Sequence, residues 1–331
     1  QLAPDEMRAL GYRVIDMIVD HLEALPNKPL TGQGKRAEME ELLREPLPEA
    51  GTSAAALLEQ VERDILGHIL HADHPRFFAF VPGPGNFVGA MGDALAAGFN
   101  IFGGTWLEAS GPTQIELVTV DWLREACGLP PSAGGLFVSG GSVANMTALA
   151  VARHIKLGSD FRTGRIYCSA QTHSSIERGM RILGFQPDQL RKLPYDGQFR
   201  LQLPALQSAV AEDRAAGQRP FCVVANAGTT NTGSVDPLPE LAEYCRREGM
   251  WFHVDGAYGA AAALCDRGKA QLRGLEHADS LALDPHKWLY QPFEIGCVIV
   301  REMRWLKQTF HIMPDYLADI EGQEDEINLC D

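Results

Sequence analysis

The chain has 331 residues, of which 45% are hydrophobic, so it is long enough for one large α/β domain with additions or for two domains. Its formal net charge of −14 argues against nucleic acid and anionic membrane surfaces as partners, because both would repel it at long range. No apolar run approaches the roughly 20 residues of a membrane-spanning helix, and no cationic leader precedes an apolar stretch, so we expect a cytoplasmic protein.

Two helical patterns come first in the chain. Apolar residues recur at helical spacing from Met7 to Leu25, where Pro26 ends the pattern, and again from Leu57 to Leu70. Neither pattern is accompanied by a strand that it could cover. We therefore expect residues 1–80 to form a helical N-terminal segment that packs on a partner subunit.

Short apolar strands alternate with helical stretches from about residue 136 onward. Strands this apolar are buried on both faces, which is typical of a mostly parallel, doubly wound sheet with helices on both faces. The gap between Trp288 and Ile295 is too short for a crossover helix, so we expect the last strand to run antiparallel. A large α/β domain is predicted over residues 81–310, with strands at residues 136–138, 166–168, 221–225, 251–254, 281–283 and 295–300.

Polar residues follow the ends of the first two strands. The turn at residues 139–142, Ser-Gly-Gly-Ser, precedes a helix, which is how backbone N–H groups and a helix dipole are directed at a phosphate. The same residues would also suit a tight turn with a helix cap. His173 follows the second strand, where its ring could serve the fold or lie flat on a ligand.

Asp255 and Lys287 follow the ends of two later strands that are neighbours in the chain. Asp255 leaves a buried strand, where a carboxylate is costly without a cationic partner, although it could also cap a helix. Lys287 comes directly after His286. A lysine that forms an imine with pyridoxal phosphate needs a carboxylate for the pyridine nitrogen, a phosphate cradle and a flat partner for the ring. Taken together, these strand ends predict a pyridoxal 5'-phosphate site.

Several motifs resemble those of one enzyme family, the group II pyridoxal-phosphate-dependent amino acid decarboxylases of fold type I. The resemblance runs from about residue 5 to the end of the chain, and Trp288 and Tyr258 place it closer to the aromatic-L-amino-acid branch than to the glutamate branch. It rests on residues 74–79 (His-Pro-Arg-Phe-Phe-Ala), 173–175 (His-Ser-Ser), 253–258 (His-Val-Asp-Gly-Ala-Tyr) and 285–288 (Pro-His-Lys-Trp).

The resemblance implies a role for each candidate site residue. Lys287 would carry the cofactor as a Schiff base, and Asp255 would keep its pyridine nitrogen protonated. Ala257 and His173 would sandwich the ring, and Thr230, which could equally serve a turn, would lie close to the cofactor. The phosphate would be held by Gly141, Ser142, His286 and Asp284, the last at a position where relatives often carry Asn.

The resemblance also implies the reaction, which is decarboxylation of an L-amino acid to the amine and CO2. The expected substrates are aromatic, namely Trp, Tyr, Phe or Dopa. Tyr316, on a mobile loop that opens a truncated C-terminal domain at residues 311–331, would return a proton to the α carbon. The substrate would contact Phe80, Pro82 and Phe102, the last from the neighbouring subunit of a homodimer with the active site at the subunit interface. Alternatives are an aldehyde synthase, an aminotransferase or desulfurase of the same fold, and a cofactor-binding fragment without activity.

Three remaining features favour no other function. The seven cysteines are scattered without a Cys-x-x-Cys pair and are expected to be reduced. His68, His71 and His74 recur at three-residue steps, but no acidic ligand completes a set, so no metal is expected. The small C-terminal domain of the family is missing from this sequence, and we expect both ends to be cut.

Overall fold

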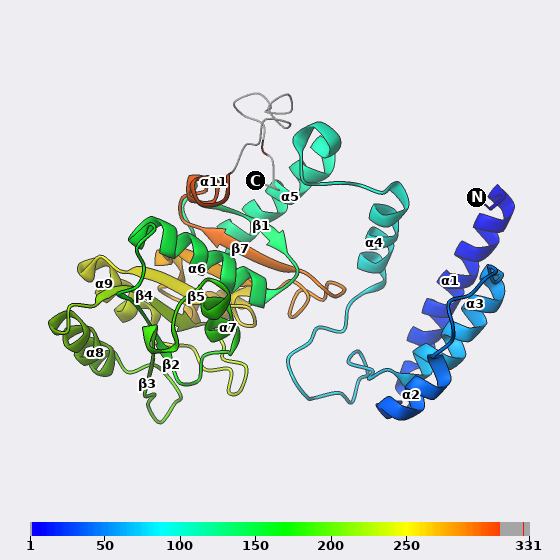
Figure 1. The fold of residues 1–331 in the computed structure, drawn as a ribbon, viewed down its shortest axis with the longest axis horizontal. Helices are drawn as coiled ribbons and strands as arrows, with labels where there is room; N and C mark the ends of the chain where they lie inside the picture. Colours follow the sequence, from blue (N-terminus) through cyan, green and yellow to red (C-terminus); the bar gives the residue numbers. More distant parts are fainter. Residues whose placement is uncertain (1, 312–326, 328–331) are drawn as a thin grey trace. The chain divides into compact units, whose positions relative to one another are not determined.

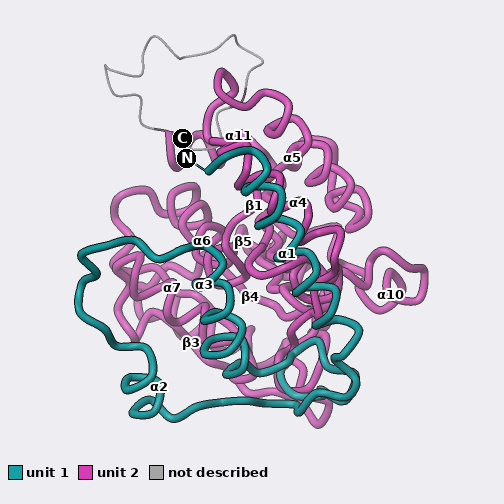
Figure 2. The backbone as a smooth tube through the Cα atoms, turned by 90° about the vertical axis from the view of Figure 1, so that its right-hand side faces the viewer, with its two compact units in different colours: residues 1–80 teal, residues 81–331 magenta. Residues whose placement is uncertain are grey.

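The computed structural model describes residues 2–311 and residue 327 of the chain. These fall into two compact units, residues 1–80 and residues 81–331, which Figure 2 shows in different colours. No helix within the described part of the chain is both long enough and apolar enough to cross a bilayer. The six cysteines that the structure describes are free thiols, and all but Cys265 are buried.

The first unit is helical, as predicted. Its longest helix, α1, begins with Pro4 at a position where the missing N–H of proline is not needed, and it has no buried residue. Its apolar side chains Met7, Val14 and Leu22 stay exposed. The unit consists of α1 (Pro4–Ala24), η1 (Leu25–Asn27), α2 (Arg36–Leu43), α3 (Ala54–Gln60), η2 (Val61–Ile65) and η3 (Leu66–His68).

The second unit is an α/β domain built around a seven-stranded sheet (Figure 1). Its strands are β1 (Gly134–Val138), β2 (Gly164–Ser169), β3 (Leu190–Leu193), β4 (Arg219–Asn226), β5 (Trp251–Asp255), β6 (Ser280–Leu283) and β7 (Gly296–Val300). Its helices are α4 (Phe87–Phe99), α5 (Trp106–Ala126), α6 (Gly141–Leu157), α7 (Ser175–Ile182), η4 (Pro187–Gln189), α8 (Leu203–Ala215), α9 (Leu238–Glu248), η5 (Ala260–Leu264), α10 (Asp266–Gln271), η6 (Leu275–His277) and α11 (Arg304–Phe310).

The sheet is mostly parallel and has the order β1-β7-β6-β5-β4-β2-β3. Only β7 runs antiparallel to its neighbours, β1 and β6, which confirms the prediction made from the short connection after Trp288. The strand β3, with the sequence Leu-Arg-Lys-Leu, was not predicted. It is a short edge strand whose two central residues are charged, so it lacks the apolar run that marks the buried strands.

Helices cover both faces of the sheet, so successive strand residues point into two separate cores. On one face Phe252 and Val254 of β5 pack with side chains of α5, α8 and α9, and on the other Trp251 packs with side chains of α6, α7 and α11. Burial on both faces explains why these strands are almost entirely apolar. The parallel strands β2, β4, β5 and β6 all end at the same edge, and the predicted site residues follow these ends.

Candidate active site

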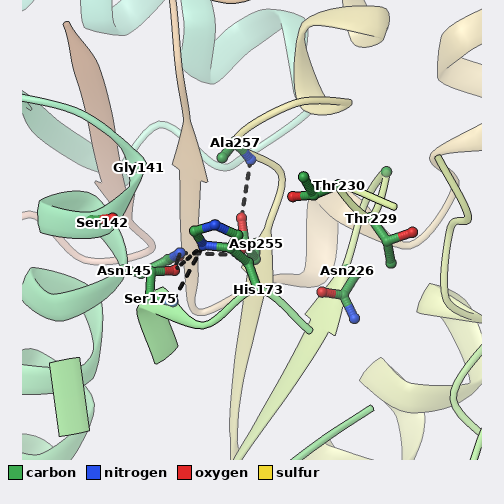
Figure 3. A pocket seen from close by; sticks show the side chains of 11 residues that line it. Gly141, Ser142, Asn145, His173, Ser175, Asn226, Thr229, Thr230, Asp255 and Ala257 are labelled. Atoms are coloured by element: carbon green, nitrogen blue, oxygen red, sulfur yellow. Dashed lines mark hydrogen bonds between the residues drawn. The ribbon is translucent and has the colours of Figure 1, made fainter. Parts of the chain in front are cut away.

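A pocket lies at the carboxyl edge of the parallel strands (Figure 3). It draws residues from the start of α6, from the segments after β2, β4 and β5, and from α7. Six predicted residues other than those of the lysine loop therefore come together in one place. The lining consists of Gly141, Ser142, Asn145, His173, Ser175, Asn226, Gly228, Thr229, Thr230, Asp255 and Ala257.

The N-terminus of α6 forms one wall of this pocket. Gly140 has φ of 144°, a conformation that favours glycine, and within the described residues no side chain caps the helix that follows. A Cβ atom at Gly141 would lie 2.7 Å from Asp284 Oδ2 and 3.0 Å from the Ala257 Cβ. Only glycine leaves room here, and the first N–H groups of α6 stay available for an anion, which the helix dipole also favours.

Lys287 lies beside this wall in an ion pair. Its Nζ is 2.9 Å from Asp284 Oδ2, and its side chain is 19% exposed, whereas that of Asp284 is 2% exposed. Asp284 Oδ1 is buried and has no hydrogen-bond partner among the described residues. Burial raises the pKa of the Asp284 carboxyl, an effect that the nearby Lys287 amine opposes.

His286 turns its ring toward the same carboxyl group. Its Nδ1 accepts a hydrogen bond of 3.0 Å from the Ile295 N–H, so a neutral ring carries its proton on Nε2, 3.6 Å from Asp284 Oδ2. Burial lowers the pKa of His286, and the Asp284 carboxylate opposes that effect. The N–H of Gly83 donates to the carbonyl of His286 at 2.9 Å, which brings the segment after Pro82 against the lysine loop.

Asp255 stands at the end of β5, opposite Ala282 of β6 in the strand register. It is buried, and its two oxygens are both engaged. Asn145 Nδ2 donates to Oδ2 at 3.0 Å, and the N–H of Ala257 donates to Oδ1 at 3.2 Å. Both contacts suit a carboxylate, which accepts hydrogen bonds and donates none.

His173 has a defined ring orientation at the mouth of the pocket. Its Nδ1 lies 3.2 Å from the N–H of Ser175, which can only donate, and 2.9 Å from the Ser175 hydroxyl. Nδ1 is therefore the acceptor, and a neutral ring carries its proton on Nε2. Figure 3 shows His173 together with Asp255 and Ala257 in the pocket.

Five lining residues were given no role by the sequence analysis: Asn145, Ser175, Asn226, Gly228 and Thr229. Asn226 closes β4, where its backbone and side-chain N–H groups both bond to Asp236 Oδ2, and burial raises the pKa of Asp236. One feature of the sequence could have indicated Asn145. It is the one amide among the buried residues of α6, which otherwise include alanine and leucine. Such an amide needs hydrogen-bond partners within the core.

The predicted substrate residues lie outside this lining. Phe102 is exposed and Pro82 is half-buried, and Phe80, which ends the first unit, is exposed as well. Their contacts with a substrate stay a prediction. Tyr316 lies outside the described residues, so its assigned role is also still a prediction.

His68, His71 and His74, for which no metal was expected, do not gather into one cluster within the described residues. His71 instead lies with His21 and Asp73, whose ligand atoms are all within 4.8 Å of one another. Lys28 Nζ is 3.0 Å from His21 Nδ1 and therefore donates to that ring. This leaves the proton of a neutral His21 on Nε2, 3.2 Å from Asp73 Oδ2, which satisfies the pair without a cation.

Comparison with known proteins gives a consistent result. The family described as "Pyridoxal-dependent decarboxylase conserved domain" matches residues 37–329. An aromatic-L-amino-acid decarboxylase of Bacillus atrophaeus is 48% identical over 99% of this chain and 68% of its own length. A phenylacetaldehyde synthase of Arabidopsis thaliana is 30% identical over 96% of the chain and 68% of its own length.

Solved structures agree with these sequence relatives. The crystal structure of Oryza sativa TDC with PLP and tryptamine superposes with a TM-score of 0.90 at 29% identity, covering 96% of this chain and 68% of that one. The 4-hydroxyphenylacetaldehyde synthase of Rhodiola rosea gives 0.89 at 28% identity, covering 99% and 72%. The chain thus spans about two thirds of the length of the relatives that it matches.

Proposed function

The chain belongs to the pyridoxal-dependent decarboxylase family, and from this premise we propose that it converts an aromatic L-amino acid to its amine and CO2. The observation that carries the proposal is the placement of Lys287 and Asp255 at the ends of adjacent strands, β6 and β5, next to the uncapped start of α6. The choice of an aromatic substrate is supported by the relative from Bacillus atrophaeus, whose name states that substrate class.

Pyridoxal phosphate, the cofactor of this family, fits the residues that are present. The N–H groups at the start of α6 suit a phosphate, the Lys287 amine suits an aldehyde, and the buried Asp255 carboxylate suits a pyridinium N–H. Asp284 Oδ1, which has no hydrogen-bond partner in the described part of the chain, is a buried polar atom that a bound group could satisfy. When bound, pyridoxal phosphate supplies an aldehyde for amino groups and a ring that withdraws electrons from the α carbon.

Lys287 is assigned the role of cofactor-binding amine. Its side chain is 19% exposed, and Asp284 holds its Nζ at 2.9 Å. A fixed amine is presented to a reactant in one orientation, which lowers the entropy lost in reaching the transition state. The neutral His286 ring lies beside Lys287 and Asp284, with its Nε2–H facing the Asp284 carboxyl.

Gly141 and Ser142 are assigned to the phosphate, with Asp284 and His286 beside them. Asp255 is assigned to the pyridine nitrogen, because its two bound donors fix the carboxylate in one orientation. Ala257 and His173 are assigned to the two faces of the ring, and Thr230 to its edge. The outward Nε2–H of His173 is then a proton donor at the pocket mouth for the substrate carboxylate.

The remaining assignments concern the proton donor and the substrate contacts. We assign Tyr316 as the proton donor to the α carbon, and Phe80, Pro82 and Phe102 to the substrate. Ring contact between Tyr258 and Trp288, with centroids 5.0 Å apart, places two aromatic side chains next to the segments that carry Asp255 and Lys287. An apolar, aromatic surround suits an aromatic side chain.

The proposed homodimer is supported by an apolar surface on α4 and α5. Exposed apolar side chains that gather on one surface are typical of a protein interface. The free buried cysteines support a reducing compartment such as the cytoplasm. The exposed apolar side chains on these two helices include Leu95, Phe99, Leu107, Ile115 and Trp122.

A substrate panel tests the proposal. The chain is supplied with pyridoxal phosphate and with Trp, Tyr, Phe, Dopa and a set of non-aromatic amino acids, and CO2 and amine are quantified alongside Lys287→Ala. Equal amounts of CO2 and amine from an aromatic substrate are expected, with none from the variant. Aldehyde, oxygen uptake and peroxide would favour the aldehyde synthase, and a keto acid would favour an aminotransferase. An imine without turnover would identify a binding fragment.

A further inference from the structure

A continuous series of hydrogen bonds runs from Asp255, through Asn145 of the pocket lining, into the core between α6 and the sheet. Trp251 Nε1 is 2.8 Å from Ser280 Oγ, which is 2.9 Å from His253 Nδ1. His253 Nε2 is 2.9 Å from Asn145 Oδ1, and Asn145 Nδ2 is 3.0 Å from Asp255 Oδ2. All five residues are buried, so water does not compete for these contacts.

The two ends of this series fix the proton on every link. The Trp251 indole can only donate, and the Asp255 carboxylate can only accept. Asn145 must therefore turn its NH2 group toward Asp255 and its carbonyl toward His253, which must carry a proton on Nε2. His253 Nδ1 is then an acceptor for the Ser280 hydroxyl, whose oxygen accepts from Trp251. With a neutral His253, no other arrangement satisfies every group in the series.

A neutral His253 is required by this arrangement, and its surroundings favour one. Its side chain is fully buried, and burial lowers its pKa to about 4 even though Asp255 opposes the effect. At neutral pH the ring therefore carries one proton. The Ser280 hydroxyl holds that proton on Nε2, because it occupies Nδ1.

Rigid elements hold the series in place. His253 and Ser280 face each other in the register of β5 and β6, and Asn145 lies in the first turns of α6. The second contact of Asn145 Nδ2 is the Ser175 hydroxyl, at 3.0 Å. Figure 3 shows Asn145 reaching toward both Ser175 and Asp255. A rotation of the amide by half a turn would set its oxygen against the carboxylate.

The geometry points to His253 as a positioning residue that acts through Asn145 to hold the Asp255 carboxylate in the orientation in which it meets the pyridine nitrogen. This inference rests on the proposed function, since it adds two residues, His253 and Asn145, to the group that serves the cofactor. Neither residue touches the reacting atoms. Their contribution is to keep one N–H fixed on Asp255, which a mobile amide would not do.

The first test uses the cofactor-free chain and so does not depend on activity. Nitrogen and proton NMR of the chain labelled at histidine identifies the signals of His253 by their loss in His253→Gln. The inference expects a proton on Nε2, none on Nδ1, and no titration between pH 6 and pH 9, a range well above the lowered pKa of about 4. A proton on Nδ1, or a ring that titrates in this range, would overturn it.

The second test compares two substitutions at His253. In His253→Gln the side-chain NH2 can still donate to Asn145, whereas His253→Leu has a similar bulk and no donor. Affinity for pyridoxal phosphate, measured by absorbance, is expected to fall at least about tenfold in the Leu variant and to recover most of that loss in the Gln variant. Equal affinity in both variants and in wild type would contradict the inference.

Two outcomes keep this inference separate from the proposed function. If circular dichroism shows that the Leu variant does not fold, Asn145→Leu replaces it, with the same tenfold loss expected and wild-type affinity as the contradicting result. If the wild-type chain itself never forms an imine with the cofactor, the proposed function fails. The NMR experiment then still decides whether His253 and Asn145 hold Asp255 as inferred.

Discussion

Asp284 Oδ2 lies 2.9 Å from Lys287 Nζ, so the amine assigned to the cofactor is paired with a buried carboxyl group. The same oxygen would be 2.7 Å from a Cβ atom at Gly141, the residue assigned to the phosphate. Asp284 therefore stands between the two groups that the cofactor has to reach. Its charge attracts Lys287 and repels a phosphate, and the protonation of Asp284 decides which effect dominates.

This position makes cofactor affinity depend on pH. Burial raises the pKa of Asp284, so the carboxyl holds its proton to a higher pH than an exposed aspartate does. As pH rises through that raised pKa, a negative charge appears beside the phosphate and affinity for pyridoxal phosphate is expected to fall. The measurement is a series of absorbance titrations of the chain with cofactor across pH, corrected for ionisation of free pyridoxal phosphate.

Asp284→Asn is the matched variant for this pH effect. The amide keeps the shape of the carboxyl but carries no charge, and it can donate to a phosphate. At neutral pH and above, it is expected to bind cofactor at least about tenfold more tightly than wild type, equivalent to ~1.4 kcal/mol. Its affinity should also vary less with pH. Weaker binding by the variant across the whole range would show that Asp284 serves the cofactor as a carboxylate.

Gly141→Ala is expected to fill the space at the start of α6 to which the phosphate is assigned. Its Cβ atom would lie 2.7 Å from Asp284 Oδ2 and 3.0 Å from the Ala257 Cβ, closer than folded structures tolerate. We expect cofactor affinity to fall by about tenfold or more, because an overpacked site costs ~1–3 kcal/mol. Gly197→Ala is the control, since its Cβ atom would meet nothing within 4 Å. If Gly141→Ala binds pyridoxal phosphate as tightly as Gly197→Ala does, Gly141 is not part of the cofactor site.

The buried hydrogen bonds of Asp236, next to the site, are expected to stabilise the fold. It accepts hydrogen bonds from the backbone N–H groups of Leu201 and Asn226, both 2.7 Å long. Asp236→Ala leaves these buried donors without a partner, so we expect a loss of ~2–4 kcal/mol in the free energy of unfolding. Urea denaturation measures this loss.

An exposed aspartate provides the comparison for that measurement. Asp160 pairs with Arg162 at the surface, where both side chains are largely exposed. Asp160→Ala is expected to leave the free energy of unfolding close to that of the wild type, since surface ion pairs contribute little. Similar losses in the two aspartate variants would mean that the bonds to Leu201 and Asn226 do not stabilise the fold.

The sequence predicted the parallel sheet and the edge at which the site lies because buried strands leave a strong apolar signal. The antiparallel direction of β7 also followed from the short connection after Trp288. The edge strand β3 could not be recognised, since Arg191 and Lys192 interrupt its apolar pattern. A strand with one exposed edge needs fewer apolar residues than a central one.

Some residues of the candidate site could also be predicted from the sequence, and others could not. Lys287, Asp255 and the turn before α6 could be predicted because each follows a strand end with a recognisable motif. The partner of Asp255 could not, since Asn145 is 110 positions away along the chain and meets it only when α6 packs on the sheet. The pairing of Asp284 with Lys287 likewise depends on side-chain orientation within the loop after β6.

The most direct test of the account is to locate the cofactor on the chain. The chain is incubated with pyridoxal phosphate, reduced with borohydride, digested and analysed by mass spectrometry for a lysine carrying the reduced cofactor. The account predicts that the label is found on Lys287 and that Lys287→Ala incorporates none at that peptide. A label confined to other lysines, or a wild-type chain that takes up no label, would contradict it.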